Sequence, residues 1–284
     1  MITMQNLRYR YGPRLAEWLV GLTVHRAKRN LRGKDIRILA DTNIRGKGVT
    51  HESAWISTGS GPPWVNSLGP GYLARIPVHG RDCDTEEYRS VKYLRGLARL
   101  ANDKSLSIWT SAELMEEEAY QPMGRFRGYG WYDYNVFGNA RFESCDGHAL
   151  TVLSSFSPST KEQQQQRLDN ATDPLFLAIA DALDPKDRND AWHIRTAERH
   201  GMYCFLTMDF KLIRKVRDRM NREPFRSLTT KVMSPEEFGK EFGLLPVKPV
   251  IFSYSGASYP VRADLHWPDS RRRPPARANS KNGA

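Results

Sequence analysis

The sequence predicts an α/β protein with a mainly parallel sheet. Short apolar runs typical of strands alternate with amphipathic helical patterns along the 284 residues, as in folds whose parallel strands are joined by helices. Several of these runs also end in an acidic residue, and the functional groups of such folds gather at the carboxyl ends of the strands. The strands are expected at 36–40, 106–109, 203–207 and 226–233.

The helices are predicted from apolar spacing and from capping residues. In the first helix, over 13–29, one face collects four apolar side chains: Leu15, Trp18, Leu19 and Leu22. Near the end of the alternating pattern, Ser234 with Glu237 three positions later predicts a capping box. The remaining helices are expected at 86–101, 110–120, 159–168, 173–183, 190–200 and 234–243.

Two segments interrupt the alternation. Residues 44–85 are rich in Gly, Pro and Ser and predict a long irregular excursion. Residues 121–147 are rich in Gly, Arg and aromatic residues, and 148–156 are expected to form a further strand. We therefore expect the following organisation: a helical extension over 1–35, a domain over 36–243 with insertions at 45–85 and 121–170, a C-terminal extension over 244–269 and a basic tail over 270–284.

The positive charge of the chain is concentrated at its two ends. Of the net charge of +11, residues 1–35 contribute +6 and residues 270–284 contribute +5. Basic ends are typical of proteins that bind RNA or DNA through phosphate contacts, and equally of proteins that are merely kept soluble by their charge. The tail is too polar and rich in Pro to be expected to fold alone.

Cysteine usage and hydropathy predict a cytoplasmic protein. Cys83, Cys145 and Cys204 lie far apart without a CxxC spacing, so reduced thiols are expected. No apolar run approaches the 18 residues of a membrane span, and the first residues lack the apolar region of a secretory signal.

Four acidic residues are expected at one edge of the sheet. Asp41 follows the first strand, and Glu116 stands two turns into the helix after the second strand. Asp209 follows the strand at 203–207, and Asp190 opens the helix before that strand. Each acid alone is more often a helix cap than a ligand. Clustered carboxylates, however, repel one another and are usually held together by a divalent cation such as Mg²⁺ or Mn²⁺. Such a site predicts metal-dependent hydrolysis of phosphate esters.

The motifs around these acids resemble those of the PIN domain family. The matching stretches are RILADTNI with Asp41, TSAELMEEE with Glu116, DAWHIRTAERHG with Asp190, CFLTMDF with Asp209, and the closing KVMSPEEFGKEFG. The resemblance is strongest over 189–242, clear at 36–44 and weaker at 105–118.

The resemblance implies a three-layer α/β/α sandwich and a nuclease that depends on Mg²⁺ or Mn²⁺ and acts most often on single-stranded or structured RNA. The metal pocket and catalytic site would be formed by Asp41, Glu116, Asp190 and Asp209. Asn43 and Thr207 match small polar positions that support such a pocket.

The identity of the second acid depends on where its helix begins. Counting from Thr110 as the cap favours Glu116, whereas counting from Ser111 favours Glu117. Glu113 lies roughly 60° around the helix from Glu116 and stays an alternative.

Other polar groups give weaker signals. Asp187 is a weaker alternative to Asp190, because DAWHIRTA places Asp190 against the apolar face of its helix. His193 and His200 stand seven residues apart and are expected to be ordinary surface or core histidines rather than a metal pair.

An insertion rich in Arg and aromatic residues is a candidate strand-binding segment. Residues 124–142 interleave the two residue types, a pattern that holds single-stranded nucleic acid by stacking and charge. Arg125, Arg127 and Tyr129 are its candidate contacts. The alternative is an insertion whose rings simply pack on the domain.

The sequence thus favours a cytoplasmic, PIN-like ribonuclease that does not bind membranes. Two alternatives stay open: a non-catalytic RNA-binding or scaffold protein with the same fold, and a structure-specific DNA nuclease. The chain is about twice as long as the compact toxins that the family includes, which favours a processing or repair role over a toxin role.

Overall fold

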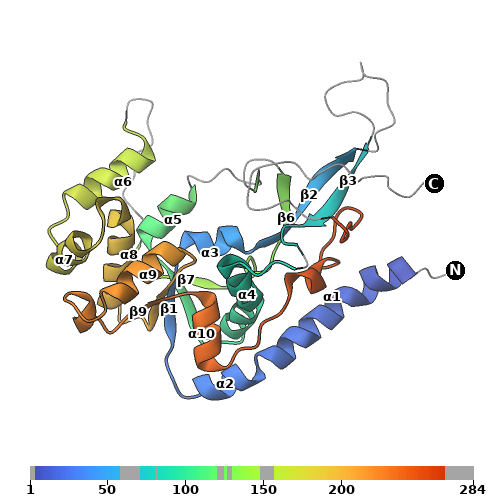
Figure 1. Ribbon diagram of the computed structural model, residues 1–284, viewed down its shortest axis with the longest axis horizontal. Coiled ribbons are helices and arrows are strands. Elements are labelled where there is room, and N and C mark those ends of the chain that lie inside the picture. Colours follow the sequence, from blue (N-terminus) through green and yellow to red (C-terminus); the bar gives the residue numbers. More distant parts are fainter. Residues whose placement is uncertain are drawn as a thin grey trace.

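A five-stranded parallel sheet forms the centre of the molecule (Figure 1). The structure, a computed structural model, describes residues 4–57, 71–80, 82–119, 125–126, 130–147 and 157–265. In sheet order the strands are β7 (Phe142–Ser144), β4 (Ser107–Thr110), β1 (Arg37–Ala40), β8 (Cys204–Leu206) and β9 (Lys231–Met233). All neighbouring pairs are parallel, which confirms the predicted α/β class.

Helices cover both faces of this sheet, an arrangement consistent with three layers. Successive residues of a strand point to opposite faces. Ile38 and Ala40 accordingly join an apolar core with α1, α2, α4 and α10, whereas Leu39 joins a second core with α6 to α9. The helices of the first core are α1 (Met4–Thr23), α2 (His25–Leu31), α4 (Glu86–Asn102) and α10 (Pro235–Phe242). Those of the second are α6 (Thr160–Asp169), α7 (Pro174–Ala182), α8 (Arg188–Arg199) and α9 (Phe210–Asp218).

Side-chain caps set several helix boundaries. The predicted capping box is present at α10, where Ser234 and Glu237 bond each other's backbone N–H groups. Thr85 caps α4, and Asp173 caps α7. None of the described helices is both long and apolar enough to cross a membrane.

Helix α1 buries its small apolar residues rather than its large ones. Ala16 and Val20 are fully buried in the first core. Leu15, Trp18 and Leu22, which the sequence places on one face, are 54% to 60% exposed. The amphipathic pattern therefore predicts the helix, but its large apolar face points away from the sheet.

A second, antiparallel sheet replaces much of the irregular excursion expected over 44–85. Its order is β3-β2-β6-β5, with β2 at Val49–Ser57, β3 at Gly71–Pro77, β5 at Arg125–Phe126 and β6 at Gly130–Asn135. The prediction of irregular structure is wrong because the buried positions of β2 include His51, Glu52 and Ser53, so no apolar alternation marks the strand. The strand expected at 148–156 lies outside the described residues.

Buried polar groups tie this sheet to the C-terminal segment. Arg75 of β3 is fully buried and forms an ion pair with Asp133. Its guanidinium also donates to the carbonyl oxygens of Ser253 and Ser255, at 2.9 and 2.8 Å. His51 contacts the same segment, with its Nε2 3.0 Å from the Ser253 hydroxyl.

The neutral state of His51 makes this region sensitive to acid. Burial, followed by the charges of Arg75 and His79, lowers the pKa of His51 to about 3. An unfolded histidine takes up its proton near pH 6.5, so stability is lost as the pH falls from about 6.5 towards 3. We predict that, between pH 7 and pH 5, the wild type loses about 2 kcal/mol more free energy of unfolding than His51→Gln.

Urea unfolding at each pH measures this difference. His25→Gln, which alters an exposed histidine of α2, serves as the control and should keep the pH slope of the wild type. An equal slope in His51→Gln and the wild type would show that His51 is not held neutral.

Candidate functional site

The candidate site lies where the order of the sheet reverses. The chain runs from β1 to β4 and β7 on one side and returns to β8 and β9 on the other. The crevice between two such neighbouring strands is where α/β folds place ligands. Asp41 directly follows β1, and its backbone N–H donates to the Leu206 carbonyl oxygen at 2.9 Å. This hydrogen bond joins the end of β1, at Asp41, to the end of β8, at Leu206.

Asp41 is held by the two small polar residues that the sequence singled out. Its Oδ2 accepts hydrogen bonds from Asn43 Nδ2 at 2.5 Å and from Thr207 Oγ1 at 2.6 Å. Asn43 in turn accepts from the Met208 N–H through Oδ1, at 2.9 Å. These bonds connect α3 (Thr42–Lys47), which Asp41 caps, to the segment after β8. The carboxylate of Asp41 is therefore positioned from both strands.

Asp209 is fixed at the start of α9. Its Oδ1 accepts from the backbone N–H groups of Lys211 and Leu212, at 2.9 and 3.1 Å. Its own N–H donates to Thr207 Oγ1 at 3.0 Å. Thr207 therefore touches both Asp41 and the backbone of Asp209, which brings the ends of the two strands into one network.

Asp190, in the first turn of α8, completes a cluster of three coupled carboxylates. Burial, together with the charges of Asp41 and Asp209, raises its pKa to about 7, although the attraction of His193 opposes this shift. Burial also raises the pKa of Asp41, although the Thr207 hydroxyl opposes this shift. No hydrogen bond or ion pair to the Asp190 carboxylate is found within the described part of the chain. Asp187 instead pairs with Lys215.

The acid of α5 (Ala112–Ala119) that faces this cluster is Glu117 rather than Glu116. Ser111 Oγ accepts from the Leu114 N–H at 3.3 Å, so the cap is Ser111, the alternative that leads to Glu117. The charge of Glu117 acts on Asp41. Glu116 lies on another side of the helix.

Arg167 of α6 engages the two other glutamates of α5. It forms ion pairs with Glu116 and, at 2.8 Å, with Glu113. Both glutamates are nearly buried, so this contact fastens α5 to α6. Of the acids of α5, Glu116 is thus the one that pairs with Arg167, whereas Glu117 is the one whose charge acts on Asp41.

His193 is the site residue that the sequence reasoning missed. Its ring is buried, and its Nε2 lies 3.0 Å from Glu117 Oε1. Burial alone would lower its pKa, but the charge of Glu117 and then those of Asp41 and Asp190 raise the pKa to about 9. The available signal was its position three residues after Asp190, which places both on one side of α8.

The arrangement offers oxygen donors to a divalent cation. Burial disfavours the ionised forms of Asp41 and Asp190, and a hard cation that prefers oxygen ligands would favour those forms. Across the described residues, no three His, Cys, Asp or Glu side chains are already placed to hold a metal ion together.

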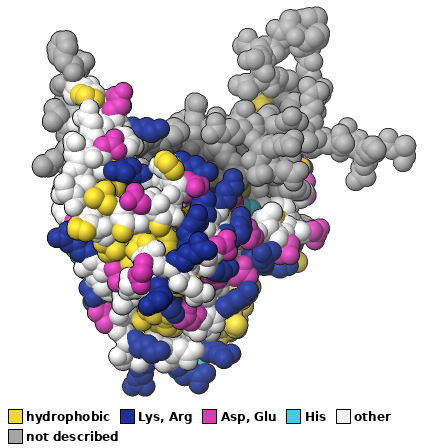
Figure 2. All heavy atoms as spheres, turned by 60° about the vertical axis from the view of Figure 1, so that its left-hand side comes forward, with side chains coloured by type: hydrophobic (Ala, Val, Ile, Leu, Met, Phe, Trp, Pro, Cys, Tyr) yellow, Lys and Arg dark blue, Asp and Glu magenta, His cyan; other side chains and the backbone are white. Residues whose placement is uncertain are grey.

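Basic residues adjoin the site, although the candidate strand-binding residues cannot be placed there. Lys211 follows Asp209 in α9, and Arg45 of α3 pairs with Glu118. Figure 2 shows the side of α6 to α9, where Lys and Arg gather with Asp and Glu among them. Arg127 and Tyr129 lie outside the described residues, and only the backbone of Arg125, in β5, is described.

In the comparisons with known proteins, no family model, curated protein or solved structure matches the chain. The interpretation of the site thus depends on its geometry and on the sequence motifs.

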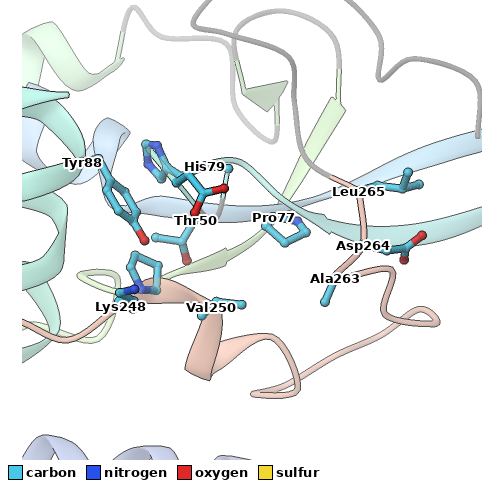
Figure 3. Close-up of a pocket in the computed structure, with 12 residues that line it drawn as sticks. Thr50, Pro77, His79, Tyr88, Lys248, Val250, Ala263, Asp264 and Leu265 are labelled. Atoms are coloured by element: carbon cyan, nitrogen blue, oxygen red, sulfur yellow. The ribbon is translucent and has the colours of Figure 1, made fainter. Parts of the chain in front are cut away.

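A separate pocket lies away from the carboxylates (Figure 3). It has a volume of about 650 Å³ and opens between the antiparallel sheet, α4 and the C-terminal segment. Thr50, Tyr88 and Lys248 contribute to its described lining, and none of the three aspartates does. Asp82 and Asp264 are the acids of its described lining, so this pocket is distinct from the site of the three aspartates.

The contact between Glu117 and His193 can be tested without an activity assay. We predict that Glu117→Gln lowers the pKa of His193 by about 1 or more, because it removes the nearest opposite charge. Glu116→Gln, on the same helix, should leave that pKa near 9. The measurement is the pH titration of the His193 ring signal by NMR, assigned with His193→Gln. Equal effects of the two glutamine variants would contradict the placement of Glu117.

Proposed function

We propose that the chain is a PIN-like, metal-dependent nuclease that cleaves RNA. The observation that carries this proposal is the coupling of Asp41, Asp190 and Asp209 at the crevice between β1 and β8. The α/β architecture with helices on both faces of a parallel sheet supports the resemblance of the motifs to PIN domains.

The three aspartates are the proposed ligands of Mg²⁺ or Mn²⁺, with Glu117 in the position that Glu116 was expected to fill. A cation bound there would supply an activated water and neutralise charge on the phosphodiester. Asn43 and Thr207 orient Asp41, and the start of α9 orients Asp209. The protonated ring of His193 partly neutralises the negative charges of Glu117, Asp41 and Asp190.

RNA is proposed as the substrate because of the positive charge of the chain. The positive ends of the chain and the basic groups beside the site favour a polyanion, and RNA is the substrate class that the motif resemblance implies. A non-catalytic RNA-binding protein is the second candidate, favoured by the lack of a preassembled group of metal ligands among the described residues.

We predict that the purified protein cleaves labelled single-stranded RNA with Mn²⁺ and not with EDTA. Asp209→Asn should lower the rate by at least about a hundredfold, because even outer-shell partners of a metal ligand contribute up to that factor. Single-stranded and branched DNA, assayed in parallel, test the DNA nuclease alternative.

Asp218→Asn is the matched control, since Asp218 is an exposed acid at the other end of α9. It should retain the wild-type rate, and circular dichroism should show that both variants fold. An equal rate in Asp209→Asn and the wild type would exclude the catalytic role, and RNA binding without cleavage would favour the second candidate.

A further inference from the structure

Helix α1 presents a continuous apolar stripe to solvent. The α1 stripe consists of six side chains that are 39% to 68% exposed: Met4, Leu7, Tyr11, Leu15, Trp18 and Leu22. Its members follow one another at intervals of three, four, four, three and four residues. At 3.6 residues per turn, this spacing keeps all six on one side of the helix.

The α1 stripe lies opposite the face by which α1 is attached. Tyr9, Ala16 and Val20 face inwards: Ala16 and Val20 are fully buried, and the Tyr9 ring meets that of Tyr254 at 5.1 Å. Figure 1 shows α1 along the outer edge of the molecule. An exposed apolar row of this length is unusual on a monomer and marks an interaction surface.

The borders of the α1 stripe are basic. Helix geometry places Arg8 on one side of the stripe and Arg14 on the other. Neither arginine has an ion-pair partner within the described ranges. The acid of α1, Glu17, is engaged by Arg95 of α4 at 2.5 Å. A partner surface that covers the stripe therefore meets uncompensated positive charge along both borders.

We propose that the α1 stripe binds an amphipathic helix of a partner protein, whose apolar residues have a matching spacing and are flanked by Asp and Glu. The row covers an arc of roughly 80°, which is narrower than the stripe by which a helix packs on a core and is typical of the seam between two paired helices. The inference is independent of the proposed nuclease activity.

Charge argues against two other occupants. A second copy of the chain would bring Arg8 and Arg14 of both helices along one seam, where like charges destabilise pairing. The tail over 270–284 carries five Lys and Arg residues and no acid, so it is also repelled.

The test measures binding of a fluorescein-labelled synthetic peptide to the full-length protein by fluorescence anisotropy. The peptide carries leucines at the intervals of the α1 stripe and glutamates at the flanking positions, and a matched peptide carries lysines in place of the glutamates. We expect saturable binding of the glutamate peptide, weakened by salt, and at least tenfold weaker binding of the lysine peptide, a loss of about 1.4 kcal/mol or more.

Two sets of variants test the two parts of the surface. Leu15→Gln with Trp18→Gln should weaken binding of the glutamate peptide at least about tenfold, whereas Leu245→Gln, at a residue 53% exposed elsewhere, should not. Arg8→Glu with Arg14→Glu should reverse the preference in favour of the lysine peptide. Circular dichroism checks that each variant folds.

Several results would overturn the proposal. These are equal binding of the two peptides, full binding after the Leu15 and Trp18 substitutions, or an unchanged preference after charge reversal. Sedimentation of the protein alone that shows a dimer lost in the Leu15 and Trp18 variant would assign the stripe to a second copy. Binding to phosphatidylserine vesicles without peptide binding would assign it to a membrane surface.

Discussion

The parallel pairing of β1 with β4 on one side and β8 on the other is the constraint on which the candidate site depends. It brings the residues after β1 and β8 to one edge of the sheet, so that Asp41 and Asp209 share Thr207 as a neighbour. Helix α8 precedes β8 and packs antiparallel to it, so its first turn returns to the same edge and delivers Asp190.

This placement has an electrostatic cost that the surrounding residues partly offset. Burial and the charges of Asp41 and Asp209 disfavour the ionised form of Asp190. Hydrogen bonds from Asn43 and Thr207 stabilise the Asp41 carboxylate. The positively charged ring of His193, which contacts Glu117, attracts the carboxylates of Asp41 and Asp190. The proposed divalent cation would relieve this cost, because the carboxylate oxygens are ligands that such cations prefer.

The parts of the fold with strong local signals follow from the sequence. Strands β1, β4, β8 and β9 were predicted from their apolar runs, and α10 was predicted from its cap at Ser234. Strand β7 was not predicted, because it lies in the segment over 121–147 that interrupts the pattern. The antiparallel sheet was not predicted, because its burial depends on distant contacts: His51 of β2 is buried against Ser253, about two hundred residues away in the chain. Asp41 and Asp209 were predicted from strand ends. The choice of Glu117 depended on the cap at Ser111, and the role of His193 depended on how α5 and α8 pack.

Binding of Mn²⁺ by the free protein is the sharpest test of a metal site at the three aspartates. Electron paramagnetic resonance reports the concentration of free Mn²⁺ during a titration, without any assumption about the substrate. We predict that the wild type binds Mn²⁺ and that Asp41→Asn, which keeps the size of the side chain, binds it at least about tenfold more weakly. Equal binding by the wild type and Asp41→Asn would show that the carboxylates at the end of β1 and β8 do not form a metal site.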